Sequence, residues 1–227
     1  MRTYLDPTAP IAANALLTDD PKAAMDLAVA LTDSPRMSNL AHGLWGYHGT
    51  TPEGLELTIQ ALGIGGASAS AVVSDLARLG VERAIRIGSC IAIGAGYLPG
   101  SVLVAGEIEA ADGAGRALFA NGRVEPDQAL TSALLHATGA AAVAPVRSVD
   151  LYPKAAETHE GAGVLDLSSA SVVATGARDG VACACALVVS EAADGLTLGR
   201  KEREESLLGL GAQAGNALAA MPQASGF

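Results

Sequence analysis

The sequence predicts an α/β fold, with a single three-layer domain over 1–227 built around a central mixed, largely parallel sheet. Two observations lead to this prediction. Short apolar runs alternate with amphipathic segments of about ten to fifteen residues, which is the pattern of strands joined by helices. Half of the 227 residues are hydrophobic, enough for a sizeable core, and no repeat or low-complexity linker divides the chain.

Local signals set the boundaries of several elements. Asp20 is typical of a helix N-cap and Pro21 of a first helical turn, so a helix begins there. Gly80 and Gly180 follow amphipathic segments and end them, because glycine readily adopts the left-handed backbone at a helix C-terminus. The nearly all-apolar run 181–190 suits a strand covered on both faces. The predicted strands cover 13–18, 55–62, 83–88, 101–107, 141–149 and 181–190, and the predicted helices cover 20–31, 68–79, 126–138, 169–179 and 201–220.

Composition and charge exclude several classes of protein. The net charge is −10, and the 14 Lys and Arg residues form no cluster, so we expect no nucleic-acid binding. The longest clean apolar run, 181–189, is too short to cross a bilayer. The N-terminus has no apolar core and carries Asp6 early, which argues against a secretory signal. The three cysteines give no disulfide framework, and we expect a cytoplasmic protein.

Common catalytic and cofactor motifs are incomplete or absent. The glycine loop 63–68 lacks the third glycine of a dinucleotide-binding fingerprint, and Arg83 stands where that fingerprint needs an acid. No Gly-x-Ser-x-Gly elbow occurs. The four histidines have no metal-ligand spacing with cysteines or carboxylates. We therefore expect neither a metal nor an organic cofactor.

An arginine within an apolar strand is the most informative single residue. Burying the Arg86 guanidinium is costly unless it finds an anion or a carboxylate. Gly88 allows close backbone approach, and the Ser89 hydroxyl is a donor, so the three residues could form an anion-binding or sugar-binding corner. The alternative is a structural arginine paired with a core carboxylate such as Asp75 or Glu107. The residues alone leave both interpretations open.

Several segments resemble the purine nucleoside/uridine phosphorylase family in order and spacing, with the closest likeness to the bacterial hexameric purine type. The resemblance, that of a divergent member, covers roughly Ala15 to the C-terminus. It implies an α/β fold, a homo-oligomer (dimer, trimer or hexamer), and cleavage of a nucleoside's N-glycosidic bond by phosphate, or by water in the nucleosidase branch. The segments that carry it are Leu62–Ser70, Leu76–Gly80, Arg86–Cys90, Gly43–Thr50, Ser148–Tyr152 and Leu167–Glu191.

The resemblance assigns an anion site in which some of the family's residues are changed. Arg86 and Ser89 match the family's strand arginine and the neighbouring hydroxyl. Asp19 replaces a glycine, and Ala23 replaces an arginine. His42 falls where a neighbouring subunit donates a further arginine. An aspartate within 4 Å of a bound phosphate costs about 4 kcal/mol at an effective dielectric constant near 20, so the resemblance implies weakened phosphate binding.

The resemblance also assigns residues that contact the nucleoside. Tyr152 matches an aromatic residue that stacks on the base, and Gly65 lies in the substrate loop. The family's Met-Glu pair, which binds the ribose hydroxyls, aligns with Leu167 and Ser168, and Asp166 precedes them. Ser168 could instead be the N-cap of the following helix, and the residues favour this capping role.

Two further residues match the family's catalytic machinery. Glu191 falls where the family has an aspartate that protonates the leaving base, and a buried glutamate with a raised pKa could serve as that general acid. Arg203 approximates an arginine that assists it, one position away.

Three functions follow as hypotheses. The first is a pentosyl-transferring glycosyltransferase that uses phosphate as co-substrate on a nucleoside, with low efficiency or on an unusual substrate. The second is a nucleosidase in which Asp19 acts as general base toward water. The third is a non-catalytic relative that binds a nucleoside or nucleobase. In each case we expect a small-molecule ligand and no nucleic-acid or membrane partner.

Overall fold

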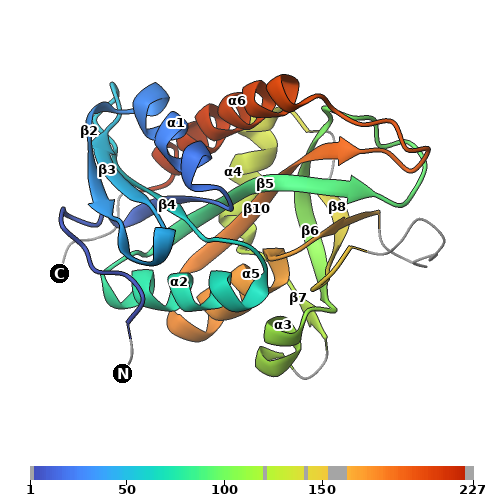
Figure 1. Ribbon diagram of the computed structural model, residues 1–227, viewed down its shortest axis with the longest axis horizontal. Coiled ribbons are helices and arrows are strands. Elements are labelled where there is room, and N and C mark those ends of the chain that lie inside the picture. The colour runs from blue at the N-terminus through green and yellow to red at the C-terminus, as the bar shows by residue number, and fades with distance from the viewer. Residues whose placement is uncertain (1–2, 120–121, 141–142, 153–162, 223–227) are drawn as a thin grey trace.

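In the part of the chain that the structure describes, ten strands form one continuous sheet with helices on both of its faces (Figure 1). The computed structural model describes residues 3–119, 122–140, 143–152 and 163–222. Helices α1, α4 and α6 pack together on one face, and α2, α3 and α5 pack on the other. The prediction of a mixed α/β fold is therefore confirmed. No helix in these described ranges has the length and hydropathy needed to span a bilayer.

Every element expected from the sequence is present, with boundaries shifted by a few residues at most ends. The strands are β1 (Asn14–Thr18), β2 (Asp33–Asn39), β3 (Gly46–Thr50), β4 (Glu56–Ala61), β5 (Arg83–Ala92), β6 (Val102–Ala110), β7 (Arg123–Val124), β8 (Val143–Ser148), β9 (Val164–Asp166) and β10 (Ala182–Glu191). The helices are α1 (Pro21–Leu31), α2 (Gly66–Arg78), α3 (Gly113–Leu118), α4 (Gln128–Thr138), α5 (Ser169–Asp179) and α6 (Arg200–Ala219), with a short 3-10 turn over Ala41–Gly43.

The helix ends follow the sequence signals. The Asp20 side chain accepts a hydrogen bond from the Lys22 amide and caps α1. Gly180, with a φ of 84°, ends α5 in the left-handed region that favours glycine. Five elements lie outside the predicted ranges: β2, β3, β7, β9 and α3. β2 is mostly exposed and polar, and β9 has only three residues, so neither gives a hydrophobic pattern long enough to recognise.

The sheet is mixed and partly closed on itself, so the expectation of a largely parallel sheet is wrong. The pairs β1–β4, β1–β5, β5–β10, β6–β8 and β8–β9 are parallel, whereas β2–β3, β3–β4, β5–β9, β6–β7 and β6–β10 are antiparallel. The strands β5, β10, β6, β8 and β9 form a closed ring, and β1, β4, β3 and β2 extend from it.

Strand β5 changes neighbours along its length, and this closes the ring. Its first residues pair with β1 as far as Arg86, which lies opposite Leu17. Farther along, Ile91 and Ala92 pair instead with β9. Loops and side chains therefore converge beside β5 between Arg86 and Ile91, the stretch where β1 has ended and β9 has not yet begun.

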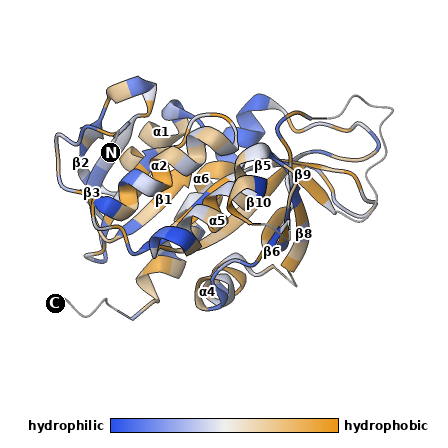
Figure 2. Cartoon of the chain, turned by 90° about the horizontal axis from the view of Figure 1, so that it is seen from below, coloured by the Kyte–Doolittle hydropathy of each residue, from blue (hydrophilic) through white to orange (hydrophobic). Residues whose placement is uncertain are grey.

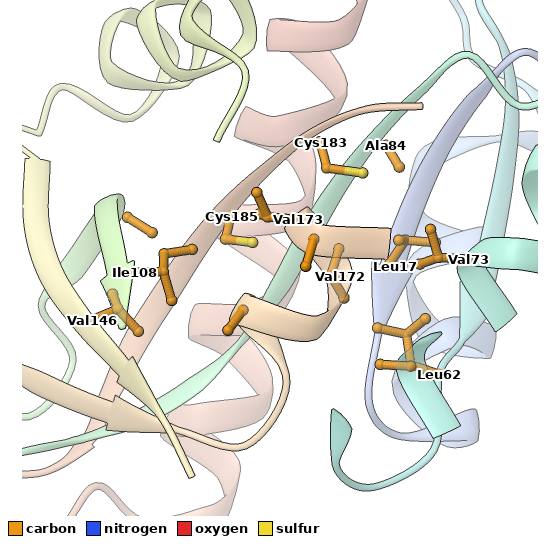
Figure 3. Close-up of a cluster of buried hydrophobic side chains, with 14 of the residues drawn as sticks. Leu17, Leu62, Val73, Ala84, Ile108, Val146, Val172, Val173, Cys183 and Cys185 are labelled. Carbon is orange, nitrogen blue, oxygen red and sulfur yellow. The ribbon is translucent and has the colours of Figure 1, made fainter. Parts of the chain in front are cut away.

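Two hydrophobic clusters fill the space between the sheet and the two helix layers. Figure 2 shows that the middle of the sheet, such as β1 and β10, is largely hydrophobic, whereas the outer strand β2 carries hydrophilic residues. In the cluster of Figure 3, Val172 and Val173 of α5 lie between Leu17 and Ile108. Cys183 and Cys185 belong to this cluster as free, buried thiols. Buried residues of β1, β5 and β10 thus belong to the core behind the candidate site.

Candidate functional site

Arg86 lies at the centre of a buried polar cluster and is only 1% exposed. Its Nη2 atom donates to both carboxylate oxygens of Asp19, at 2.9 and 3.2 Å. Its Nη1 atom lies 3.1 Å from a carboxylate oxygen of Asp166. Burial opposes the charge of Arg86, but the two carboxylates outweigh burial and raise its pKa. Arg86 is therefore a buried cation held between two carboxylates.

Two serine hydroxyls complete the contacts of the guanidinium. The Nε atom of Arg86 donates to Ser168 Oγ at 2.8 Å, and Nη1 donates to Ser169 Oγ at 3.1 Å. Ser168 Oγ in turn donates to Asp19 at 3.3 Å. Each of the three guanidinium nitrogens thus has a partner within the chain. Asp75 and Glu107, the partners considered from the sequence, instead pair with Arg78 and Arg123.

Asp166 binds the start of α5 as well as Arg86. Its Oδ2 atom accepts from the backbone amides of Ser168 and Ser169, at 3.3 and 2.9 Å, and from Ser169 Oγ at 2.6 Å. Ser148 Oγ donates to Oδ1 at 2.5 Å. The expectation that Ser168 caps α5 through its side chain is wrong, because Asp166 accepts these amide hydrogen bonds and frees the Ser168 hydroxyl for Arg86.

Gly88 has a steric reason to be glycine. A Cβ atom at this position would lie 2.8 Å from Arg86 Nη2 and 3.0 Å from its Cζ. Because carboxylates and hydroxyls on several sides hold the guanidinium, it could not move aside without losing hydrogen bonds. Gly88 therefore provides the space that the Arg86 cluster occupies.

Asp19 connects the buried cluster to solvent. It follows β1, and its side chain is 35% exposed. Burial raises the pKa of its carboxyl, and Asp166 adds to this rise, whereas Arg86 and Ser168 act in the opposite direction. The net direction is upward, although the open edge of the side chain moderates the effect of burial. Asp19 is thus a carboxylate with an accessible edge and a raised pKa.

A cavity of about 390 Å³ opens beside Asp19. It lies between α1, α6 and the stretch of β5 that follows Arg86, and Figure 1 shows α6 lying along α1 above the strands. Ser89 and Arg203, two predicted site residues, line this cavity together with Asp19. Three of the predicted residues therefore meet around one space.

Other predicted residues lie elsewhere. Glu191 is the last residue of β10, where the pairing with β5 is irregular, and its backbone forms an isolated antiparallel β-bridge with Thr197. Glu191 does not line the cavity. His42 is exposed in the turn before β3, where its ring meets the Tyr4 ring edge-on with centroids 5.8 Å apart. Gly65 precedes α2 with a φ of 84°.

Tyr152 and Leu167 flank the polar cluster without joining its hydrogen bonds. Tyr152 is 39% exposed, yet burial of its phenol and the charge of Asp166 raise its pKa. The charge of Arg86 acts on the pKa of Tyr152 in the opposite direction. Leu167 is half-buried between Asp166 and Ser168. The charges of Asp166 and Arg86 thus both affect the Tyr152 phenol.

The glycine loop before α2 serves packing. Gly66 is buried where α2 approaches Asp112 and Ser171, and a Cβ atom there would overlap both side chains. This contact explains the glycine without a bound phosphate. The described residues also contain no group of three or more His, Cys, Asp or Glu side chains placed to hold a metal ion.

Sequence reasoning missed Ser148, Ser169 and Arg200. The two serines complete the shell of Asp166, and Arg200 lines the cavity. A usable signal was present for Ser169, because the start of α5 carries hydroxyls within an otherwise apolar segment, whereas Ser148 ends β8 without such a signal. Arg200 gave no signal, because it is one of many charged residues at the start of α6.

Comparison with known proteins gives one partial similarity. No protein family model matches the chain. It is 36% identical over 84 residues to a purine nucleoside phosphorylase of the DeoD type from Oceanobacillus iheyensis. The match covers 37% of this chain and 35% of that protein, so the chain spans about a third of the curated relative that it matches. The match supports a nucleoside phosphorylase relationship.

Proposed function

We propose that this protein cleaves the N-glycosidic bond of a nucleoside and uses water as the nucleophile. The partial similarity to a purine nucleoside phosphorylase supports the choice of substrate. The observation that carries the choice of nucleophile is the ion pair of Arg86 with Asp19, at 2.9 Å. A carboxylate thus lies against the arginine that the family resemblance assigns to phosphate.

Charge balance favours water over phosphate beside Arg86. Asp19 and Asp166 already neutralise the guanidinium, and Ser168 and Ser169 accept its remaining hydrogen bonds. A phosphate at this point would approach the Asp19 carboxylate, at a cost of about 4 kcal/mol at 4 Å and an effective dielectric constant of 20. A neutral water molecule meets no such repulsion and can donate a hydrogen bond to Asp19.

The proposed reaction is a hydrolysis in which water adds to the sugar and the base leaves. A water oxygen bonds to C1′ of the sugar while one of its protons moves to the Asp19 carboxylate. The bond from C1′ to the base nitrogen breaks with its electron pair, and the base takes a proton from solvent. Asp19 then releases its proton to solvent. Arg86 and Ser168 are positioning residues, because they hold the carboxylate at the edge of the cavity. A raised pKa makes Asp19 a better proton acceptor than an ordinary aspartate.

The test is an assay of free base from a panel of purine and pyrimidine nucleosides, with and without phosphate. We expect base release without phosphate and free sugar as the second product. Asp19→Asn should lower kcat by about a hundredfold or more, the usual contribution of a general base. Asp33→Asn, an exposed residue of β2, is the matched control and should leave kcat unchanged. Folded protein that releases no base from any nucleoside, phosphorylated or not, contradicts the proposal.

Phosphorolysis is the second candidate function. It is favoured by Ser89, which lines the cavity, and by the raised pKa of Asp19, since a neutral carboxyl no longer repels phosphate. This candidate predicts base release that depends on phosphate, yields a sugar 1-phosphate and increases as the pH falls. Hydrolysis predicts the opposite pH trend, because the general base must be ionised.

A further inference from the structure

The cavity beside Asp19 has an apolar side and a charged side. Ala23 and Leu27 of α1 and Leu207 and Leu208 of α6 contribute apolar surface to it. Its volume of about 390 Å³ is in the range of small-molecule sites. A ligand that fits both sides carries a flat or apolar part together with a charged group.

The basic side chains around the cavity are paired with carboxylates, except for one arginine, and Asp20 accepts a hydrogen bond from the Lys22 amide. Lys22 forms an ion pair with Asp26, and Arg200 forms one with Glu204 at 3.1 Å. Arg203 also lines the cavity, but its side chain has no hydrogen bond or ion pair with any described residue. Its guanidinium is therefore available to a ligand. A guanidinium with free donors binds phosphate or carboxylate oxygens in a fork geometry.

Ser89 provides a second available donor. It lies on β5, three residues after Arg86, and its hydroxyl has no hydrogen-bond partner among the described residues. Ser89 and Arg203 thus reach the same cavity from a strand and a helix that pack together. Together they offer a charged fork and a neutral hydroxyl, a donor set suited to phosphate oxygens.

Asp19 limits where a negative ligand group can lie. Its carboxylate also lines the cavity and repels an anion close to it. An anionic group bound by Arg203 therefore lies away from Asp19, and the uncharged bond to be cleaved lies nearer the carboxylate. In a hydrolysis that consumes no phosphate, the anion at Arg203 belongs to the substrate.

We propose that the substrate is a nucleoside monophosphate, and that the Arg203 guanidinium and the Ser89 hydroxyl bind its phosphate group. The inference rests on the proposed function, since it names the substrate class for the same cavity. It makes Arg203 a phosphate-binding residue instead of an assistant to the leaving base.

The experiment compares AMP, IMP and UMP with the matching nucleosides, by free base release and by calorimetry. We expect kcat/KM to be at least tenfold higher for the preferred nucleotide than for its nucleoside. Arg203→Met should raise KM for that nucleotide by about ten- to a hundredfold, the range for losing a charged hydrogen bond, with little change for the nucleoside. Arg203→Lys should recover part of the loss. Lys201→Met, an exposed neighbour on α6, is the control and should change neither value.

Each of the following results overturns the nucleotide inference, the proposed function or both. Equal rates on nucleosides and nucleotides, unaffected by Arg203→Met, overturn the nucleotide inference and leave the proposed hydrolysis standing. Nucleotide binding that Arg203→Met removes, without any cleavage, supports the phosphate site and overturns the proposed function. Inorganic phosphate that binds as tightly as the nucleotide and accelerates nucleoside cleavage shows that free phosphate is the ligand, and overturns the inference. Absence of both binding and cleavage overturns both.

Discussion

The Arg86 guanidinium donates to both carboxylate oxygens of Asp19, at 2.9 and 3.2 Å. Asp19 follows β1, and Arg86 is the last residue of β5 that pairs with β1. The carboxylate therefore meets the guanidinium where the two strands part. This ion pair occupies the position that the family resemblance gives to phosphate, and it is the basis for proposing water as the nucleophile.

Removing the buried guanidinium should destabilise the fold. In Arg86→Met, Asp166 stays fully buried without its cation, and breaking a buried pair costs about 3–5 kcal/mol. Urea unfolding measures the change. Lys201→Met removes a lysine whose side chain is 89% exposed and should change the free energy of unfolding by less than about 0.5 kcal/mol. A loss below about 1 kcal/mol in Arg86→Met would contradict a structural role for the cluster.

Adding one methyl group at Gly88 should also be costly. In Gly88→Ala the new Cβ atom would lie 2.8 Å from Arg86 Nη2, and overpacking of this kind costs about 1–3 kcal/mol. Gly209→Ala is the matched control, because a Cβ atom there meets nothing within 4 Å and the residue lies in the interior of α6. Alanine should stabilise the helix at Gly209 by about 0.5–1 kcal/mol. Chemical denaturation measures both changes. Equal changes in the free energy of unfolding for the two variants would contradict this prediction, because they would show that the Arg86 side chain moves aside at little cost.

An ion pair at the end of α5 should give the fold a pH-dependent contribution. Hydrogen bonds from Arg178 and Ser74 lower the pKa of Asp179 to about 2, below its ordinary value of 3.8. Since the folded-state pKa is the lower one, the contribution is present above about pH 4 and is lost as the pH falls through 2. Asp179→Asn should therefore lower the melting temperature at pH 6, with the difference from the unmodified protein shrinking toward pH 2. A difference in melting temperature between the two proteins that does not vary with pH would contradict this contribution of the Asp179 ion pair.

The buried thiols should resist modification in the folded protein. Cys90, Cys183 and Cys185 are free and buried, and burial raises the pKa of Cys185 to about 12. At pH 8 these thiols are protonated and poorly nucleophilic. A disulfide reagent such as DTNB should release almost no chromophore from native protein and three equivalents after guanidinium unfolding. Introducing Cys at the exposed position Ala193 supplies the control, which should react at once. Rapid reaction of a native thiol would contradict this burial.

Much of the fold was predictable because its signals are local. Asp20 with Pro21 marks the start of α1, and Gly180 marks the end of α5; both depend on a few neighbouring residues. The apolar run of β10 likewise indicated a strand covered on both faces. β2 and β9 escaped prediction because an exposed edge strand and a three-residue strand leave no periodic pattern to detect.

The candidate site was only partly predictable. An arginine in an apolar strand required an anionic partner, so Arg86 was identifiable from the sequence. Its partners were not, because Asp19 and Asp166 are distant in sequence and no local rule joins them to Arg86. Glu191, expected to protonate the leaving base, does not line the cavity that Asp19, Ser89 and Arg203 share.

By itself the sequence determined the helices and strands that have a clear local pattern, the ends of several helices and the need to neutralise one buried arginine. The tertiary structure decided that the sheet closes through β5 and β10, that β9 replaces β1 beside β5, and that two carboxylates converge on Arg86. The physical reason is that caps and periodicity act over a few residues. The pairing of strand edges and of buried charges, by contrast, depends on which distant segments the folded core brings together.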